Sequence, residues 1–273
     1  MTSSPIAPST TADILSVEHL KKSFGAVEVL RDVTFSAQAG EFVCIVGPSG
    51  VGKTTLLRAL AQLGPADSGR VVLDGRTVTA PPPEMAVVFQ DYSRSLMPWS
   101  RVAGNVELPL HRSKLTRTER RARVEKALAD VGLHDVSDRY PWQLSGGMQQ
   151  RVAIARSLAY HPDVLIMDEP FASVDAQTRA DLEDLMLDIR TRLGVTIVLV
   201  THDIDEAVYL ADKVIVLSGR PAAVTASVPV PLGENRDQIS TKALPVFLEL
   251  RAQIHEMIMR PAAPSDSAQS VRK

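Results

Sequence analysis

The sequence has little of several features that would assign it to a particular class of protein. It contains one cysteine in 273 residues, so an intrachain disulfide is excluded. Its 30 basic and 32 acidic residues leave a net charge of −2, which does not favour a protein held to nucleic acid by phosphate charge. No apolar run approaches the roughly 20 residues that span a bilayer. What remains, 45% hydrophobic and 23% charged residues, is typical of a globular domain with a large core.

Both ends of the chain are rich in Ser, Pro, Thr and Ala. Residues 1–12 lack a basic start and a hydrophobic segment, so we expect a disordered tail and not a secretory signal. Residues 261–273 are expected to form a second tail. We expect a cytoplasmic protein, for which any work at a membrane would need another subunit. The single cysteine, Cys44, lies in the apolar run EFVCIVG and is interpreted as a buried, reduced core thiol.

Short apolar runs rich in β-branched residues recur along the chain and predict strands. The runs without alternation favour strands buried on both faces, as in a parallel sheet, whereas the earlier alternating runs favour an antiparallel part near the N-terminus. Helical patterns fall between the later strands, which is the arrangement of an α/β fold. The expected strands are 14–20, 31–37, 41–47, 70–75, 84–90, 163–169, 195–202 and 212–218.

A long segment before residue 163 contains no convincing strand and predicts an inserted α-helical subdomain. Residues 116–133 predict a helix that begins with a capping box of Thr116 and Glu119 and ends at Gly132. Its arginine-rich face is interpreted as a solvated surface, with a nucleic-acid or lipid contact as the alternative. The expected boundaries are 13–260 for the whole domain, about 91–160 for the helical subdomain and about 222–260 for a C-terminal strand and helix.

GPSGVGKTT, residues 47–55, lies between a predicted strand and a predicted helix. It satisfies G-x-x-x-x-G-K-[ST], in which glycines let backbone N–H groups surround phosphates. Lys53 supplies positive charge for the β- and γ-phosphate oxygens, and the Thr54 hydroxyl is suited to bind Mg²⁺. The motif predicts a nucleotide site made of Gly47, Pro48, Ser49, Gly50, Val51, Gly52, Lys53, Thr54 and Thr55.

Three further strands end in polar residues that we expect at the same edge of the sheet. In DVLIMDEP, Asp168 is expected to hold Mg²⁺ or its waters, whereas Glu169 points the other way and suits polarising the attacking water. His202 is placed to touch the γ-phosphate and that water, and Gln90 to bind Mg²⁺ and orient the water. Each would be an ordinary strand end by itself, so the prediction depends on their combination with the phosphate loop.

The turn LSGGMQQR, residues 144–151, runs directly into an amphipathic stretch. Ser145, Gly146 and Gly147 expose amide groups at a helix start, where unpaired N–H groups and the helix dipole favour an anion. The sequence therefore contains a second anion site, without a lysine, about a hundred residues after the first.

Taken in order, these motifs resemble those of the ATP-binding subunits of ABC transporters. GPSGVGKT, Gln90, LSGGMQQR, LIMDEP and His202 occur in that family's order, and SVD at 173–175 matches a loop that more often reads SALD. The resemblance covers about residues 14–220. It implies a P-loop NTPase with a mixed or parallel β core, an antiparallel β part near the N-terminus and an inserted α-helical subdomain, and with ATP and Mg²⁺ as its nucleotide and cofactor.

The same resemblance implies how the second anion site is used. Two nucleotide domains pack head to tail in that family, so Ser145, Gly146 and Gly147 would face the ATP held by the partner. Phe24 matches a position where an aromatic ring stacks on adenine, with a core phenylalanine as the alternative. Asp175 would contribute to communication across the dimer. The expected partner is therefore a second copy or a paired ATPase subunit.

The stretch 91–110 predicts contact with membrane subunits. Leu96, Met97, Pro98 and Trp99 form an apolar cluster suited to a groove for a short helix, with packing of Trp99 inside the helical insert as the alternative. Together with the preceding VFQ, it resembles the subgroup that imports nitrate, sulfonates and taurine. This implies an ATPase at the cytoplasmic face of the inner membrane, with separate permease subunits and a solute-binding protein.

Three other functions are compatible with the nucleotide motifs. The ATPase of an exporter is one. An ABC ATPase in translation or DNA handling is the second, but the chain has one ATPase unit, no long heptads, no cysteine cluster and no basic surplus, so no nucleic acid is expected. The third is a regulator that binds ATP without hydrolysis, against which the presence of both Glu169 and His202 argues.

Overall fold

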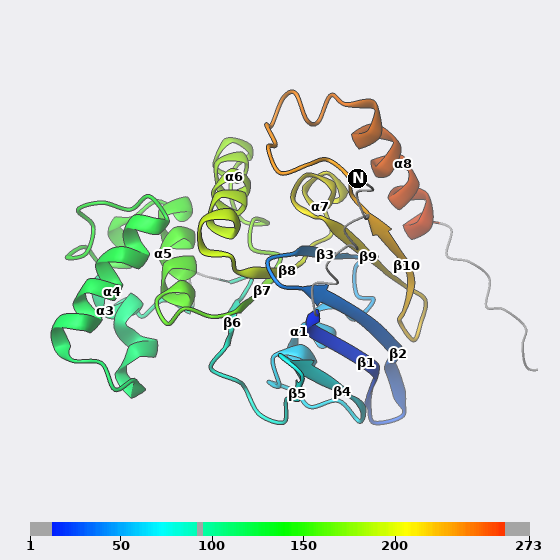
Figure 1. Cartoon of the computed structure of the whole chain (residues 1–273), viewed down its shortest axis with the longest axis horizontal. Coiled ribbons are helices and arrows are strands. Elements are labelled where there is room, and N and C mark those ends of the chain that lie inside the picture. Colours follow the sequence, from blue (N-terminus) through cyan, green and yellow to red (C-terminus); the bar gives the residue numbers. More distant parts are fainter. Residues whose placement is uncertain (1–12, 92–94, 260–273) are drawn as a thin grey trace, which may run out of the picture.

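The structure is a computed structural model that describes residues 13–91 and 95–259. A lobe built on β-sheets and a lobe built on helices lie side by side in it (Figure 1). The tails expected at 1–12 and 261–273 lie outside the described residues. Within the described ranges, no helix has the length and apolar character that a membrane crossing requires.

An antiparallel sheet forms the N-terminal part of the sheet lobe, as the alternating sequences predict. Along β1 the side chains of Leu15 and Val17 are buried while their neighbours are more exposed, so one face of the sheet packs on the core. The segment 70–75 also joins this sheet. Its strands, in the order β2-β1-β4-β5, are β1 (Asp13–Phe24), β2 (Val27–Gln38), β4 (Ser68–Leu73) and β5 (Arg76–Thr77).

A second sheet of six strands forms the centre of the lobe, and five of its strands are parallel. Every residue of β3, β7 and β8 is buried, which explains why these strands are continuous apolar runs in the sequence. The order is β10-β9-β3-β8-β7-β6, formed by β3 (Phe42–Val46), β6 (Met85–Val88), β7 (Val164–Asp168), β8 (Thr196–Val200), β9 (Lys213–Ser218) and the antiparallel β10 (Ala223–Pro229).

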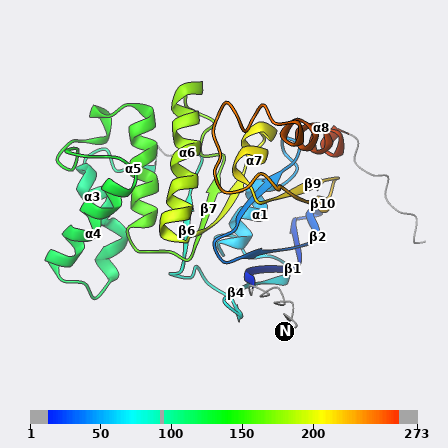
Figure 2. The same cartoon turned by 45° about the horizontal axis from the view of Figure 1, so that its top comes forward.

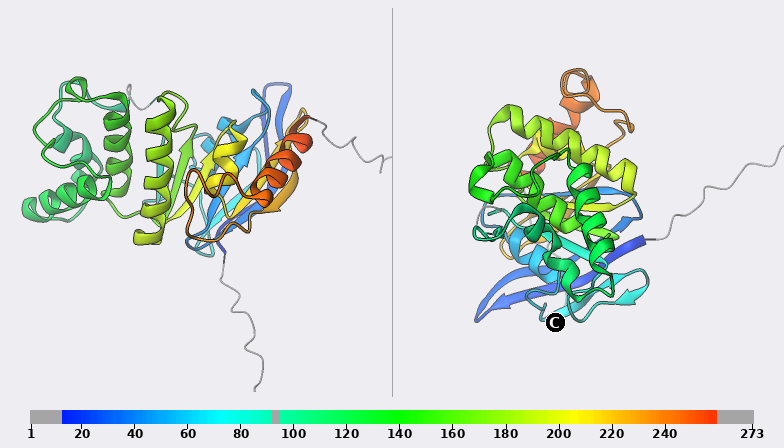
Figure 3. Two further views of the ribbon diagram at one scale, coloured as in Figure 1. Left: turned by 90° about the horizontal axis from the view of Figure 1, so that it is seen from above. Right: turned by 90° about the vertical axis from the view of Figure 1, so that its left-hand side faces the viewer.

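The two faces of the six-stranded sheet are covered by separate apolar cores. Val43 and Ile45 of β3 face a core shared with the antiparallel sheet and α1 (Lys53–Leu60). Phe42 and Cys44 face the opposite core, so Cys44 is the buried thiol that the sequence predicts, and burial raises its pKa. Figures 2 and 3 show the helices of that second side, which are α6 (Ala176–Leu193), α7 (Ile204–Leu210) and α8 (Pro245–Met259).

The helical lobe is inserted between β6 and β7, two neighbouring parallel strands. The helix α4 (Arg117–Asp130) begins at the predicted capping box. Thr116 accepts from Glu119 N at 3.3 Å, and Glu119 accepts from Thr116 N at 2.7 Å. Ion pairs on its arginine-rich face include Arg121 with Glu125, which suits a solvated surface. The lobe contains α3 (Val102–Glu107), η1 (Leu108–Arg112), α4 (Arg117–Asp130), η2 (Pro141–Gln143) and α5 (Gly146–Leu158).

The segment between β10 and α8 is fastened to α6 and α7. Arg236 donates hydrogen bonds to the carbonyl oxygens of Tyr209, at 2.7 Å, and Ala211, at 2.9 Å, at the C-terminal end of α7. Gln238 Nε2 donates to Asp184 Oδ1 of α6 at 2.8 Å. These bonds satisfy carbonyls that the end of a helix leaves without partners, and they tie the last part of the chain to the sheet lobe.

Candidate functional site

The phosphate loop connects β3 to α1 and lies at the carboxyl end of the parallel sheet. A Cβ atom at Gly47 would stand 2.4 Å from the carbonyl oxygen of Leu217 in β9, so only glycine allows this close approach. No side chain caps the start of α1. The unpaired N–H groups of its first turn and the helix dipole make this end of α1 a site for an anion.

Lys53 opens α1 and is folded back over the loop. Its ammonium group donates to the carbonyl oxygens of Gly47 at 2.9 Å and Pro48 at 3.2 Å, and its side chain is only 6% exposed. Burial lowers the pKa of Lys53, an effect that the nearby carboxylates Glu169 and Asp168 oppose. The lysine is thus held beside the loop, where an incoming phosphate would satisfy its charge better than two carbonyls do.

The donors expected for Mg²⁺ are brought together by α1 and β7. Thr54 Oγ1 lies 3.5 Å from Asp168 Oδ1. Burial raises the pKa of Asp168, while the hydrogen bond from Thr54 lowers it. Carboxylate, hydroxyl and amide oxygens are the ligands that Mg²⁺ prefers, so Thr54, Asp168 and Gln90 fit this ion by donor chemistry.

Glu169 and His202 are brought together at the adjacent strand ends. His202 Nδ1 lies 2.9 Å from Glu169 Oε2, and the backbone N–H of Glu169 donates to the carbonyl of Val200 at 2.8 Å. Glu169 has a φ of 42°, a conformation that costs energy for a residue with a Cβ. The bond to β8 holds the backbone in this conformation. The strand therefore ends at Asp168, and the Glu169 carboxylate lies beside His202.

One open groove joins most of the predicted nucleotide residues. Phe24 at its margin is 60% exposed, so it is not a core residue, and Lys22 Nζ lies 5.4 Å from its ring centre. Gly47, Pro48 and Val51 of the phosphate loop do not line the groove. The side chain of Val51 is buried in the core, and its N–H donates to Pro48 O at 3.3 Å. The groove is lined by Phe24, Val29, Ser49, Gly50, Gly52, Lys53, Thr54, Thr55, Gln90 and Glu169.

The turn 145–147 does not line this groove, since it lies in the helical lobe at the start of α5. Ser145 is the N-cap of the helix and accepts from Met148 N at 3.3 Å. A Cβ atom on Gly147 would stand 2.4 Å from Cγ2 of Thr178 in α6. The turn is therefore packed tightly against the start of the next long helix.

Asp175 is the N-cap of α6, a role that the sequence reasoning missed. It accepts from Thr178 N at 3.0 Å and from Thr178 Oγ1 at 2.7 Å, and these two bonds, the backbone bond first, lower its pKa. An Asp three residues before a Thr at a helix start is the signal that would have revealed it. Asp175 does not line the groove.

The apolar cluster predicted at 96–99 is divided in the structure. Leu96 is 2% exposed and belongs to the core of the helical lobe, whereas Trp99 is 77% exposed. The alternative prediction, that Trp99 packs inside the helical insert, is therefore wrong. Residues 92–94, which precede the cluster, lie outside the described residues.

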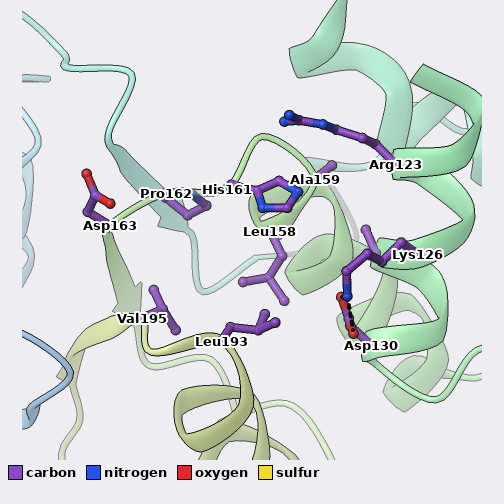
Figure 4. A pocket seen from close by; sticks show the side chains of 11 residues that line it. Arg123, Lys126, Asp130, Leu158, Ala159, His161, Pro162, Asp163, Leu193 and Val195 are labelled. Carbon is purple, nitrogen blue, oxygen red and sulfur yellow. Dashed lines mark hydrogen bonds and ion pairs between the residues drawn. The ribbon is translucent and has the colours of Figure 1, made fainter. Parts of the chain in front are cut away.

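A separate hollow of about 180 Å³ lies between the two lobes (Figure 4). Arg123 and Lys126 of α4 form one side of it, and His161, before β7, faces them. Lys126 is paired with Asp130 at 3.0 Å. None of the predicted nucleotide residues lines this hollow, so it is distinct from the groove at the phosphate loop.

A strand, a glycine-rich loop and a helix, with carboxylates at the end of a nearby parallel strand, define a P-loop nucleoside triphosphatase. Residues 30–172 match the family model described as "ABC transporter". The nitrate import ATP-binding protein NrtD of Synechococcus elongatus is 39% identical over 272 residues, which cover 96% of this chain and 98% of that protein. The taurine import ATP-binding protein TauB of Rhizobium johnstonii is 41% identical over 254 residues, which cover 90% and 96%.

Among solved structures, CbiO1 of Clostridium perfringens, described as part of the ABC transporter complex CbiONQ, has a similar fold. The TM-score is 0.76 at 29% identity, and the match covers 91% of this chain and 96% of that chain. The chain belongs to the ABC transporter family. It is an ATPase subunit that binds ATP and hydrolyses it to power transport, which confirms the family, the fold class and the enzyme class predicted from the sequence. Roles in translation or DNA handling are not favoured.

Proposed function

We propose that this chain is the ATPase subunit of an importer for a small anion such as nitrate, a sulfonate or taurine. The names of the relatives support this substrate class, since NrtD is a nitrate import protein and TauB a taurine import protein. The stretch after β6 resembles the same subgroup, in agreement with those names. The observation that carries the catalytic part is the contact of Glu169 with His202 at the edge of the phosphate-loop groove.

In the proposed site, the triphosphate of ATP lies across the phosphate loop and the start of α1. Lys53 leaves the carbonyls of its own loop and binds the β- and γ-phosphates, while the exposed ring of Phe24 stacks on adenine. Thr54, Asp168 and Gln90 would hold Mg²⁺, which neutralises phosphate charge when bound. Phe24, Lys53, Thr54 and Gln90 line one groove, and Asp168 lies 3.5 Å from Thr54, which supports a single continuous nucleotide site.

Hydrolysis is assigned to Glu169 and His202. Glu169 polarises a water that lies near His202, and the water attacks the γ-phosphate through a loose transition state. Lys53 and the backbone N–H groups of the loop stabilise the charge that develops on the phosphate oxygens. The 2.9 Å contact between Nδ1 and Oε2 supports this division of labour, because it fixes one carboxylate oxygen.

A second ATPase subunit completes the site. Ser145, Gly146 and Gly147 form an anion site that lies outside the groove of their own chain, which supports a role at the partner's ATP. Asp175 caps α6 and orients Thr178, which packs against Gly147. Asp175 is thereby linked to the turn that would face the partner, which supports a contribution to communication between the two ATP sites.

The proposed membrane partners are separate permease subunits, with a solute-binding protein on the other side of the membrane. The exposed ring of Trp99 supports a contact on the helical lobe, since large exposed aromatics mark interaction surfaces. The ATPase would then be a peripheral protein at the cytoplasmic face of the inner membrane. Closure of the ATPase pair on ATP and its reopening after hydrolysis would drive the permease.

Replacement of the proposed base tests this function. Glu169→Gln is expected to bind ATP as the wild type does but to lose about 100-fold or more in kcat, because a neutral amide is a poor base. With ATP and Mg²⁺ it should elute as a dimer in size-exclusion chromatography, and tagged protein should retain a polytopic membrane protein from solubilised membranes. Glu249→Gln, an exposed change in α8, is the control. Near wild-type turnover by Glu169→Gln would contradict the assignment.

The substrate class is tested with the solute-binding protein that belongs to the same transporter. Thermal shift with nitrate, taurine and an alkyl sulfonate should identify a ligand that raises its Tm. Stabilisation by none of these anions, and by an uncharged solute instead, would contradict the anion proposal. The ATPase assignment is independent of that result.

A further inference from the structure

A small cavity lies behind the contact between Glu169 and His202. Its volume is about 50 Å³, and it is surrounded by α6, by α7 and by the segments that follow β7 and β8. Arg179 comes from α6, and Glu206 from the first turn of α7, which follows His202 directly. The lining residues are Glu169, Ala172, Arg179, Thr201, His202, Asp203 and Glu206. The cavity therefore connects the proposed catalytic pair with polar side chains that the mechanism has not used.

Two of those side chains have polar atoms without partners among the described residues. Glu206 is 5% exposed, and its Oε1 atom is buried with no hydrogen bond. Arg179 Nε is buried and unpaired as well. An unpaired buried donor or acceptor destabilises the fold, and in native proteins such atoms usually bond to protein groups or to ordered water. One donor and one acceptor line the same cavity, which is the minimum that a bridging water requires.

The size of the cavity agrees with this requirement. A buried water needs a cavity of roughly 10–15 Å³ and two to four polar partners, and this cavity of about 50 Å³ is large enough. Burial, followed by the nearby carboxylates Glu183 and Asp203, raises the pKa of Glu206 well above its usual value. A side-chain hydrogen bond with Thr201 opposes this rise in the pKa of Glu206. In either protonation state the carboxyl group offers an acceptor oxygen to a water.

The loop that carries His202 is held from the same side. Arg179 Nη1 pairs with Asp203 Oδ2 at 3.3 Å, and Asp203, the N-cap of α7, accepts from Glu206 N at 3.2 Å. The N–H of Asp203 also donates to Thr201 Oγ1 at 3.0 Å. The residues on both sides of His202 are thus fixed by bonds around the cavity, whereas the His202 ring bonds to Glu169.

We propose that the cavity holds ordered water that bridges Arg179 Nε and Glu206 Oε1 and keeps His202 in position against Glu169. Arg179 and Glu206 are then positioning residues, which act on the γ-phosphate only through His202. This inference rests on the proposed roles of Glu169 and His202. The water would transmit any shift of α6 to the histidine, because Arg179 belongs to α6 and Glu206 to α7.

Glu206→Leu tests the bridge, because leucine fills similar space without polar atoms. It is expected to lower kcat about tenfold through a misplaced His202, with an unchanged KM for ATP. Its Tm should be equal to or above that of the wild type, since the desolvated carboxyl is gone. Glu206→Gln restores the acceptor and should recover most of kcat. Glu249→Leu, the matched exposed change in α8, should behave as the wild type.

Two outcomes of this experiment would overturn the inference. One is a wild-type kcat in Glu206→Leu. The other is a loss of kcat in Glu206→Gln as large as that in Glu206→Leu, which would assign the effect to the charge of the carboxylate. A high-resolution crystal structure supplies a readout that does not depend on catalysis. Ordered water within hydrogen-bond distance of Arg179 and Glu206 is expected, and a dry cavity would refute the bridge. If Glu169→Gln kept full turnover instead, the proposed base would be wrong while the water site stayed testable.

Discussion

Replacement of Gly147 by alanine tests the close packing of α5 against Thr178 in α6. The new Cβ would stand 2.4 Å from Cγ2 of Thr178, and the threonine is not free to turn away because its hydroxyl bonds to Asp175 at 2.7 Å. Overpacking of this kind costs about 1–3 kcal/mol. Alanine in a helix is favoured over glycine by roughly 0.5–1 kcal/mol, so the free energy of unfolding should fall by about 1–2 kcal/mol.

A second substitution turns this into a double-mutant cycle. Thr178→Ser removes the methyl group in the way and keeps the hydroxyl that bonds to Asp175. In the Thr178→Ser background, Gly147→Ala should be neutral or stabilising, which gives a coupling energy of about 1–3 kcal/mol, equal to the cost of the overpacking. Urea unfolding of the four proteins, followed by circular dichroism, measures each value. The reasoning is refuted if Gly147→Ala alone is as stable as the wild type, or if Thr178→Ser does not relieve its cost.

Three further predictions concern other parts of the chain. Lys53→Ala should weaken ATP binding about 10- to 100-fold in isothermal titration calorimetry, since charged hydrogen bonds to phosphate are lost, and unchanged affinity would contradict the assignment. Thr116→Ala should lower the free energy of unfolding by about 1 kcal/mol through loss of the cap of α4, and equal urea midpoints would argue against it. Because burial raises the pKa of Glu206, the folded state keeps a proton that the unfolded chain releases above about pH 4.3, so stability falls as pH rises. The free energy of unfolding of Glu206→Gln relative to that of the wild type should therefore rise from pH 5 to pH 7.5 in urea unfolding, and a constant difference would refute this sign.

The regular parts of the fold follow closely from local sequence. Strands buried on both faces are continuous apolar runs, and α4 begins at the capping box that its residues specify. The segment 70–75, a run without alternation that follows 41–47, was expected among the parallel strands, and that expectation is wrong. It forms β4 beside β1, and that pairing is set by contacts about fifty residues apart, such as Glu18 with Arg70.

The candidate site was predicted as far as it depends on motifs. Sequence order places Asp168, Glu169 and His202 at strand ends, and parallel pairing of β7 with β8 brings them to one edge. The conformation of Glu169 was not predictable, because it depends on a hydrogen bond to β8. Glu206 gave no signal either, since an acidic residue in the first turn of a helix is normally solvated, whereas Glu206 is buried in the packed fold.

The point at which the helical lobe joins the sheet has a consequence for engineering. The lobe leaves after β6 and returns before β7, and these strands are neighbours, with Val88 paired to Met167. Because the two strands are parallel, the chain leaves at the carboxyl end of β6 and returns at the amino end of β7, where Val164 pairs with Met85. The inserted segment therefore crosses from one edge of the sheet to the other, and its two connections are separated by about the length of β6. Grafting the lobe of one family member onto the sheet lobe of another must keep that separation, and it would then exchange the surface that carries Trp99 while the phosphate loop stays in its original frame.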